Sequence, residues 1–395
     1  MTSSTVLVIN SGSSSIKYQL LDPESGETLA SGLVERIGES EGILTHKFGD
    51  TKVEESDPIP DHGAGLRRVI ELCDEVGPNL ASAGVIAVGH RVVQGGALFD
   101  RAVLIDDEVR KTIKDLIDLA PLHNPPNLRG IEVGQEVLPD IPHVAVFDTA
   151  FFRQLPDAAA TYALNRATAE KYAIRRYGFH GTSHKYVSQR VSDILGRDDL
   201  RQIVLHLGNG ASASAVVGGR AVDTSMGLTP LEGLVMGTRT GDIDAAAVFH
   251  LRRVAGMDVD TIDKLFNKES GLKGLAGEND MRAVRRMAEE GDANARNALD
   301  VYIHRLRKYI GSYTAVMNGL DAIAFTAGVG ENDAKMRSEA CAGLGYFGIE
   351  LDEEANAARS GDEREISTPD SRVRVFVIPT NEELEIARQA VALLG

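Results

Sequence analysis

The chain has 395 residues, 43% hydrophobic and 25% charged, which is typical of a folded protein large enough for two domains. Its formal net charge of −16 argues against a nucleic-acid partner, although a few local cations and Mg²⁺ can still hold a polyphosphate. No segment is apolar for long enough to span a bilayer, so no membrane partner is expected. The N-terminal segment lacks a secretory pattern and the two cysteines form no CxxC motif, which together predict a cytoplasmic location.

The first predicted elements are two strands, over 6–9 and 16–21, inside the stretch TVLVINSGSSSIKYQLL. The Ser/Gly turn between them is not a P-loop, because it lacks the Gly-Lys-Ser/Thr ending and leads into a strand rather than a helix. The stretch IVLHLGNGASASAVVGGRAVDTS, 203–225, repeats the order of strand, small polar turn, strand, Gly turn and strand. This echo predicts two halves that begin with the same three strands, with a ligand cleft between them.

Apolar periodicity predicts helices over 107–120, 184–195, 295–317, 332–344 and 382–394. Thr380 and Glu383 are predicted to form a capping box for the last helix. A strand over 322–325 leads into TAGVGEN, 326–332, and the order strand, Gly loop, helix suits a phosphate or nucleoside. A single strand–Gly–strand segment is usually a plain hairpin, but three Gly turns, two of them in matching places, favour a ligand site.

Two arginines stand in unusual surroundings. Arg91 lies between apolar residues in GHRVVQGG, and Arg239 lies in GTRTGD, where small residues let a ligand approach the backbone. Each arginine either pairs with a structural carboxylate or binds an anion through its planar guanidinium, and the two together favour one shared anion. Asp148 follows a buried strand, where it either caps a turn or joins an α/β active site. Glu382 alone is explained by the helix dipole.

Each histidine likewise has a structural and a functional interpretation. His123 lies in PLHNPPN, predicted to be a rigid loop, where a lone histidine is more often structural than catalytic. His180 and His184 in FHGTSH have helical spacing, but the small residues between them and the missing Glu argue against a zinc-protease motif. His206 precedes LGNG and suits a phosphate contact. If these polar groups converge, apolar neighbours would form a small pocket for a short acid: Val93, Leu122, Phe179 and Pro230.

Over nearly its whole length the chain resembles the acetate kinase family. INSGSSSIKY and GFHGTSHKYV are similar to its two signatures, and further blocks follow in the family's order: HRVVQGG, PLHNPPN, FDTAF, HLGNGAS, GLTPLEGLVMGTRTGD, AGVGEN and PTNEEL. The departures are Gln94 where His is common, Thr240 where Ser or Cys is common, and the Ala-Ser that follows LGNGAS.

The resemblance implies an α/β fold, the duplicated βββαβαβα arrangement of actin, hexokinase and Hsp70, with the active site in the interdomain cleft. The implied domains are 1–150, completed by 382–395, and 151–381, which binds the nucleotide. The implied reaction is reversible transfer of the γ-phosphoryl group of ATP to acetate, giving ADP and acetyl phosphate, in a homodimer. The implied metal is Mg²⁺, with Mn²⁺ as a substitute, and propionate or another short-chain acid remains the alternative acceptor.

The resemblance also implies roles for individual residues. The metal positions are Asn10 and Glu382. The catalytic positions are Arg91, His123, Asp148, His180 and Arg239, and Arg91 also binds the acceptor beside Val93, Leu122, Phe179 and Pro230. The nucleotide positions are Lys17, His206, Leu207, Gly208, Asn209, Gly210, Asp280, Met281, Arg282, Gly328, Val329, Gly330, Glu331 and Asn332.

The acceptor itself bears on the role of Asp148. A carboxylic acid with a pKa of about 4 is already ionised at neutral pH and needs no general base. Asp148 is therefore predicted to orient an arginine or a magnesium-bound water rather than to abstract a proton. A sugar kinase or a polyphosphate phosphatase would need such a base and a more polar acceptor site. An ATP-driven binding module would need a further domain, for which no residues are left over.

Overall fold

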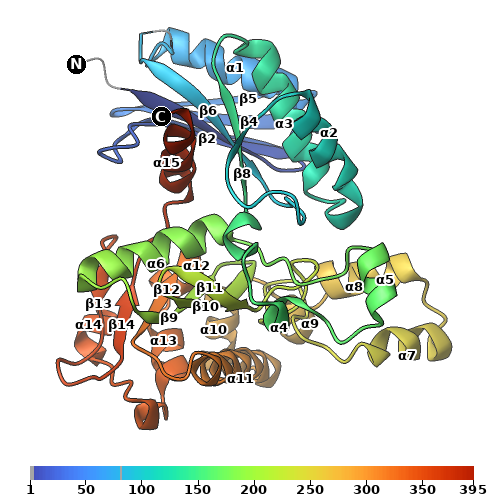
Figure 1. Ribbon diagram of the computed structural model, residues 1–395, viewed down its shortest axis with the longest axis vertical. Coiled ribbons are helices and arrows are strands. Elements are labelled where there is room, and N and C mark those ends of the chain that lie inside the picture. Colours follow the sequence, from blue (N-terminus) through green and yellow to red (C-terminus); the bar gives the residue numbers. More distant parts are fainter. Residues whose placement is uncertain (1–3, 81) are drawn as a thin grey trace. The chain divides into compact units, whose positions relative to one another are not determined.

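The computed structural model describes residues 4–80 and 82–395, which form two compact units. Unit 1 runs from the N-terminus to Arg153 and resumes at Asn381, and unit 2 is Gln154–Thr380. The chain therefore passes between the units twice. Figure 1 shows the elements of each unit.

Unit 1 is built on an eight-stranded sheet in the order β5-β4-β3-β2-β1-β6-β8-β7. Strands β1, β2 and β3 are antiparallel neighbours, whereas β6 pairs in parallel with β1 and β8 pairs in parallel with β6. The TVLVINS segment forms the central β1 because nearly all its side chains are buried. The strands are β1 (Thr5–Ser11), β2 (Ser15–Leu21), β3 (Thr28–Glu35), β4 (Gly42–Phe48), β5 (Thr51–Asp57), β6 (Val85–Val92), β7 (Val103–Leu104) and β8 (His143–Phe147).

Helices cover both faces of this sheet. The helices are α1 (His62–Glu75), α2 (Asp107–Asp115), α3 (Asn124–Val137) and α15 (Glu382–Leu394), with 3₁₀ turns η1 (Ile117–Leu119) and η2 (Ala150–Phe152). Successive residues of β6 face opposite sides. A Cβ atom at Gly89 would lie 2.7 Å from Ile386 of α15, and the next residue, His90, lies against Gly134 of α3. The C-terminal helix, dark red in Figure 1, thus packs on the N-terminal sheet, opposite α3.

Unit 2 repeats this plan. Its six-stranded sheet has the order β11-β10-β9-β12-β14-β13, so β9, β10 and β11 form an antiparallel meander and β12 and β14 continue in parallel from β9. The strands are β9 (Arg201–Leu207), β10 (Ala211–Val217), β11 (Arg220–Thr224), β12 (Ala322–Thr326), β13 (Arg364–Glu365) and β14 (Arg374–Val377). The expected duplication of the opening meander is confirmed.

The helices of unit 2 pack on this sheet and extend beyond it. Val187 and Val191 of α6 pack on Val204, Ala324 and Phe376 of the strands, and α11 packs against β9 and β10. The helices are α4 (Asp157–Ala160), α5 (Arg166–Lys171), α6 (Gly181–Leu195), α7 (Ala246–Val254), α8 (Val259–Lys268), α9 (Gly271–Ala276), α10 (Met281–Glu289), α11 (Ala293–Val316), α12 (Ala327–Asn332), α13 (Ala334–Cys341) and α14 (Glu353–Ala357), with the 3₁₀ turn η3 (Gly345–Phe347).

Three predicted helices differ from those observed. The helix expected over 107–120 ends at Asp115 and gives way to the 3₁₀ turn η1. The helix expected over 332–344 is interrupted at Asp333, whose side chain caps α13 by accepting from the Met336 N–H. The helix expected from His184 begins at Gly181, because His180 adopts a left-handed conformation with φ 58° and serves as the N-cap.

The predicted capping box of α15 is wrong. Asn381 is the N-cap, and its side chain accepts from the Leu384 N–H at 3.0 Å. Thr380 donates instead to the Ser183 hydroxyl at 2.8 Å within unit 2, and Glu383 forms an ion pair with Lys17 within unit 1. Both side chains are thus engaged by residues far away in the sequence.

Candidate active site

The carboxyl ends of β6 and β8 bring Arg91 and Asp148 together in unit 1. Arg91 Nε donates to Asp148 Oδ1 at 2.9 Å, and Nη2 donates to Oδ2 at 2.6 Å. Glu382, at the start of α15, lies on the same guanidinium, with 3.8 Å between its Oε2 and Arg91 Nε. The Asp148 side chain is only 1% exposed and is bound by Arg91 rather than capping a turn. Three predicted site residues therefore converge.

Charge and burial act together on this cluster. Burial opposes the charge of Arg91, but Asp148 and Glu382 outweigh it and raise the pKa of the guanidinium. Burial also raises the pKa of the Glu382 carboxyl, with Arg91 opposing the shift and Asp148 adding to it. Arg91 therefore stays charged between the carboxyl groups of Asp148 and Glu382.

The segment after Arg91 is held by two asparagines that the sequence analysis did not single out. The N–H groups of Val93 and Gln94 donate to the side-chain oxygens of Asn127 and Asn124, at 3.0 and 3.1 Å. Asn127 also donates to the carbonyl of Ser11 at 2.7 Å, which ties this segment to β1. The signal was present, because both asparagines belong to PLHNPPN.

PLHNPPN is a helix start rather than the predicted rigid loop. His123 is the N-cap of α3, and Pro125 and Pro126 occupy its first turn. The N–H groups of a first turn have no partner within the helix, so prolines there cost no hydrogen bond. Val93 is 8% exposed and Leu122 is 53% exposed, so the structure buries only one of these two predicted pocket residues. The catalytic role predicted for His123 stays a prediction.

Asn10 and Lys17 are opposite each other on β1 and β2. Directly opposed residues of antiparallel strands share a face, so both side chains belong to one side of the sheet. The Lys17 ammonium is paired with Glu383 of α15. Its predicted contact with a nucleotide stays a prediction.

In unit 2, His180 and Arg239 meet at the turn between β9 and β10. A Cβ atom at Gly210 would lie 3.7 Å from His180 Nε2 and 3.8 Å from Arg239 Nη1. Arg239 Nη1 also donates to the Pro230 carbonyl at 3.1 Å, and burial lowers the pKa of its guanidinium. Phe179, the residue before His180, is 1% exposed. Four predicted residues and Gly210 are therefore neighbours.

The His206 side chain lies further from the protein surface than its position before LGNG predicts. Its ring stacks on the His180 ring with 4.3 Å between centroids, and its Nδ1 is 2.8 Å from the Ser183 hydroxyl. The adjoining Leu207 is fully buried. The His206 ring therefore packs against the His180 ring. The predicted contact of His206 with a phosphate stays a prediction.

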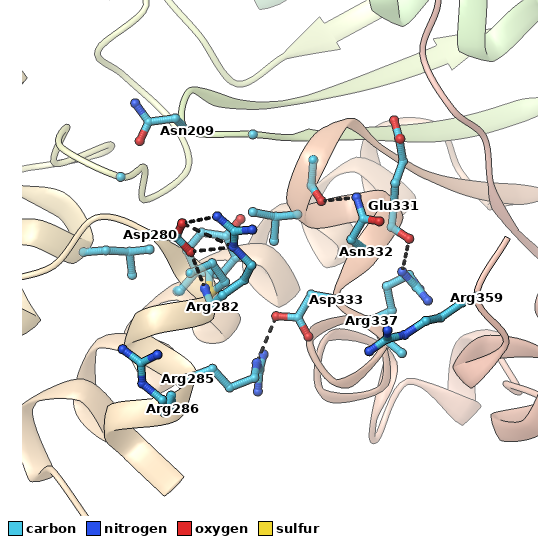
Figure 2. A pocket seen from close by; sticks show the side chains of 18 of the residues that line it. Asn209, Asp280, Arg282, Arg285, Arg286, Glu331, Asn332, Asp333, Arg337 and Arg359 are labelled. Carbon is cyan, nitrogen blue, oxygen red and sulfur yellow. Dashed lines mark hydrogen bonds and ion pairs between the residues drawn. The ribbon is translucent and has the colours of Figure 1, made fainter. Parts of the chain in front are cut away.

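A pocket of about 1220 Å³ lies within unit 2, among the β9–β10 turn, the start of α10 and helix α12. Figure 2 shows the side chains of Asn209, Asp280, Arg282, Glu331 and Asn332 around it. The predicted nucleotide residues that line it are Gly208, Asn209, Asp280, Met281, Arg282, Gly328, Val329, Glu331 and Asn332. One continuous pocket thus unites segments that lie up to 156 positions apart in the sequence, from 208 to 364.

Several basic residues of this pocket escaped the sequence analysis: Arg285, Arg286, Arg337, Arg359 and Arg364. Arg337 is 1% exposed and donates to the carbonyls of Gly330, Glu331 and Asn356, which fixes helix α12. Scattered arginines with no glycine-rich motif around them gave no local signal, because only the fold collects them.

Within residues 4–80 and 82–395 there is no cluster of three or more His, Cys, Asp or Glu side chains that could hold a metal ion. Over the same residues, no helix has the length and apolar character needed to cross a membrane.

Comparison with known proteins decides the family. The model of the acetokinase family matches residues 5–388. The chain belongs to the acetokinase family. It is 58% identical over 390 residues to the acetate kinase of Leifsonia xyli subsp. xyli, covering 98% of both chains. Crystal structures of Porphyromonas gingivalis acetate kinase (42% identity, 99% and 100% coverage) and a Francisella tularensis propionate kinase (41%, 99% and 100%) each superpose with a TM-score of 0.94.

Membership of the acetokinase family confirms the resemblance read from the motifs and the predicted fold class. The two substitutions that depart from the common acetokinase pattern have local partners. The Gln94 side chain accepts from the Gly96 N–H at 2.9 Å, and the Thr240 hydroxyl donates to the Gly241 carbonyl at 2.9 Å. Each side chain therefore stabilises its own turn.

Proposed function

We propose that this protein is an acetate kinase, which transfers the γ-phosphoryl group of ATP reversibly to the carboxylate of acetate. The observation that carries the proposal is the 58% identity to an acetate kinase along 98% of both chains. The arrangement within each unit supports it, because phosphoryl transfer requires anion binding, in-line positioning and neutralisation of charge.

Arg91 is proposed to bind the acceptor. Its pair with Asp148 fixes the guanidinium at two points and leaves one N–H of Nη2 and both N–H groups of Nη1 as further donors. Asp148 orients Arg91 and takes no proton from the acceptor, since acetate is ionised at neutral pH. On the family's pattern, the buried Val93 remains a proposed contact of the acceptor, and Leu122, Phe179 and Pro230 remain proposed acceptor positions.

His180 and Arg239 are proposed to stabilise the transferred phosphoryl group. Both reach the space beside Gly210, where the absence of a side chain leaves room for a ligand. A donor that strengthens its hydrogen bond only in the transition state contributes about 3–4 kcal/mol. His123 is proposed as a further polar group of the acceptor site.

The pocket beside Asn209, Asp280 and Asn332 is proposed to hold ATP or ADP. The volume of the pocket suits a nucleotide, and the surroundings of Tyr302 are a second indication of a ligand. This tyrosine lines the pocket at 2% exposure, and its hydroxyl has no hydrogen-bond partner among the residues that the structure describes. Lys17, His206, Leu207, Gly210 and Gly330 remain proposed nucleotide positions on the family's pattern.

Asn10 and Glu382 are proposed to hold Mg²⁺, or Mn²⁺ in its place. They fit a hard cation: both offer oxygen donors, and α15, which carries Glu382, packs against β1, which carries Asn10. A site with few protein ligands suits Mg²⁺, which keeps waters and phosphate oxygens in its coordination shell. When bound, the ion would neutralise charge on the phosphoryl group.

Two further properties are proposed. A homodimer would cover apolar side chains of unit 2 that are more than half exposed around α7 and α8, namely Phe249, Val254 and Val259. Sedimentation of the Phe249→Glu variant tests this, with a monomer as the expected result. A cytoplasmic location fits Cys73 and Cys341, which are both buried and free.

Trapping of the acyl phosphate with hydroxylamine tests the activity and the acceptor. The protein is incubated with MgATP and formate, acetate, propionate or butyrate, and the hydroxamate is measured. We expect the highest kcat/KM with acetate, and a strong loss in Arg91→Ala but not in Arg201→Ala, which removes an arginine from a surface pair with Asp321. A higher kcat/KM with propionate would favour the alternative acceptor, and no hydroxamate with any acid would contradict the proposal.

A further inference from the structure

Ser212 lies between two histidines at the start of α6, the N-cap His180 and the helical His184. Its hydroxyl is 2.9 Å from His180 Nδ1 and 2.7 Å from His184 Nε2. Beyond His184 the series continues, because the Ser214 hydroxyl is 2.7 Å from His184 Nδ1. Four side chains thus form a linear series of hydrogen bonds: His180, Ser212, His184 and Ser214.

The secondary structure explains this alignment. His180 is the left-handed N-cap of α6 and His184 lies in the first turn of that helix, so both residues are at the start of α6. Ser212 and Ser214 are two positions apart on β10 and therefore point to the same face of the sheet. The Ser212, Ser214 and His184 side chains are fully buried, so bulk solvent does not reach them.

The number of protons constrains the direction of these bonds. Burial, with the nearby His206, lowers the pKa of His184 well below its ordinary value, so His184 is neutral and has one N–H and one bare nitrogen. Each serine hydroxyl has one proton to donate. The series can therefore run in only two consistent directions, toward His180 or away from it.

If each hydrogen bond is donated in the direction of His180, both serine hydroxyl protons are used. Ser214 donates to His184 Nδ1, His184 Nε2–H donates to Ser212, and Ser212 donates to His180 Nδ1. In the opposite direction Ser214 must accept, and its own proton then has no acceptor among the residues that the structure describes. Buried donors without acceptors are rarer than unused lone pairs, so the first direction is favoured.

We propose that Ser212 and His184 are positioning residues that keep a proton of His180 on Nε2, the nitrogen that faces the Gly210 turn and Arg239, whenever the His180 ring is neutral. The inference rests on the proposed role of His180 in phosphoryl transfer and adds how that donor is held. A neutral imidazole offers a donor at only one nitrogen, so the wrong tautomer would present a lone pair to the anionic phosphoryl oxygens.

The experiment uses the full chain with ¹⁵N-labelled histidine at about pH 8, above the ordinary histidine pKa. Long-range ¹H–¹⁵N spectra report which ring nitrogen carries the proton, and the His180→Gln variant assigns the His180 signals. In the wild-type protein we expect the proton on Nε2. Ser212→Ala should populate the Nδ1–H tautomer and lower kcat by about tenfold, the effect of one hydrogen bond, with nearly unchanged KM values.

Two more variants complete the experiment. Ser214→Ala leaves the contact between Ser212 and His180 in place and should give a smaller shift of the same kind, which keeps the test informative if Ser212→Ala folds poorly. Ser225→Ala is the matched control, since this serine is also fully buried but accepts from the Ala213 N–H. The control should leave the His180 signals and kcat unchanged.

The positioning role of Ser212 and His184 and the role of His180 in the reaction would be contradicted by different results. An Nδ1–H tautomer in the wild type, or unchanged kcat and tautomer in both Ser212→Ala and Ser214→Ala, would overturn the positioning role. Wild-type kcat in His180→Gln would instead overturn the proposed role of His180 in the reaction, whatever the tautomer.

Discussion

Arg91 and Asp148 are 57 positions apart in the sequence and are joined by two parallel hydrogen bonds of 2.9 and 2.6 Å at the ends of neighbouring strands. This fork geometry fixes the plane of the guanidinium. It supports the proposed role of Asp148, which is to orient Arg91 rather than to act as a base.

Asp148→Asn should therefore lower activity by weakening the position of Arg91. The amide replaces one acceptor oxygen with an NH₂ group that faces an arginine N–H, and a lost charged hydrogen bond of about 1.5–3 kcal/mol corresponds to about a 10- to 100-fold lower kcat/KM for acetate. The basic limb of the pH profile should stay as in the wild type. Asp321→Asn is the control, because Asp321 forms a similar fork with Arg201 elsewhere. Loss of the basic limb with unchanged Mg²⁺ dependence would show that Asp148 is a base after all.

Arg91→Ala should raise the KM for acetate and also lower kcat, because the guanidinium is proposed to bind both the ground state and the transition state. Arg91→Lys keeps the charge but not the planar fork, so it should recover only part of either loss. Steady-state kinetics with varied acetate and varied ATP separate the two substrates. Unchanged acetate kinetics in both variants would remove Arg91 from the site.

Gly328→Ala should weaken nucleotide binding without unfolding the protein. Gly328 lines the large pocket of unit 2, and a Cβ atom there would meet no protein atom within 4 Å, so the added methyl projects into space for the ligand. We expect the KM for ATP to rise by about tenfold, the cost of about 1.4 kcal/mol. Gly311→Ala in α11 is the matched control, since its Cβ is equally free of contacts, and it should leave KM unchanged. Equal KM values in both variants would place the nucleotide elsewhere.

Gly210→Ala probes the space between His180 and Arg239. The added Cβ would be 3.6–3.8 Å from these side chains, an ordinary contact distance, so the fold should tolerate it. The methyl group would occupy the position proposed for a phosphoryl oxygen, and kcat should fall by about tenfold or more. A thermal melting midpoint near that of the wild type checks that the fold is intact. A fully active variant would argue that the phosphoryl group does not pass this turn.

Acid should destabilise the protein through its buried histidines. His90 Nε2 and His143 Nδ1 are 2.8 Å apart, and burial lowers the pKa of both rings, with the charge of His143 also acting on His90. The folded state keeps these rings neutral while the unfolded chain binds protons below about pH 6.5. Stability is therefore present above this pH and is lost as the pH falls below it, by about 1.4 kcal/mol per pH unit for each such histidine.

The thermal midpoint measured between pH 7 and pH 5 checks this expectation. His90→Gln should flatten the decline, whereas His250→Gln, at an exposed position of α7, should not change it. A midpoint that does not change over this range would contradict the prediction.

The sequence alone was sufficient for the family and the duplicated meander, and it supplied the candidate site residues that the structure then positioned. The two Ser/Gly turns, the strand before TAGVGEN and the neighbours of Arg91 and Arg239 are short contiguous segments, and their meaning depends on side-chain order and local backbone preference. Membership of the acetokinase family followed from these segments, because their order is preserved from residue 5 to residue 388.

Tertiary structure decided what each polar group contacts. Thr380 and Glu383 had the spacing of a capping box, yet Thr380 binds Ser183 and Glu383 binds Lys17, because Asn381 was better placed to cap the helix. The pair of Arg91 with Asp148 and the position of Ser212 between two histidines likewise depend on strands and helices distant in the chain. A local pattern fixes which groups are available, but the lowest free energy of a buried polar group is reached only where the whole fold supplies its partner.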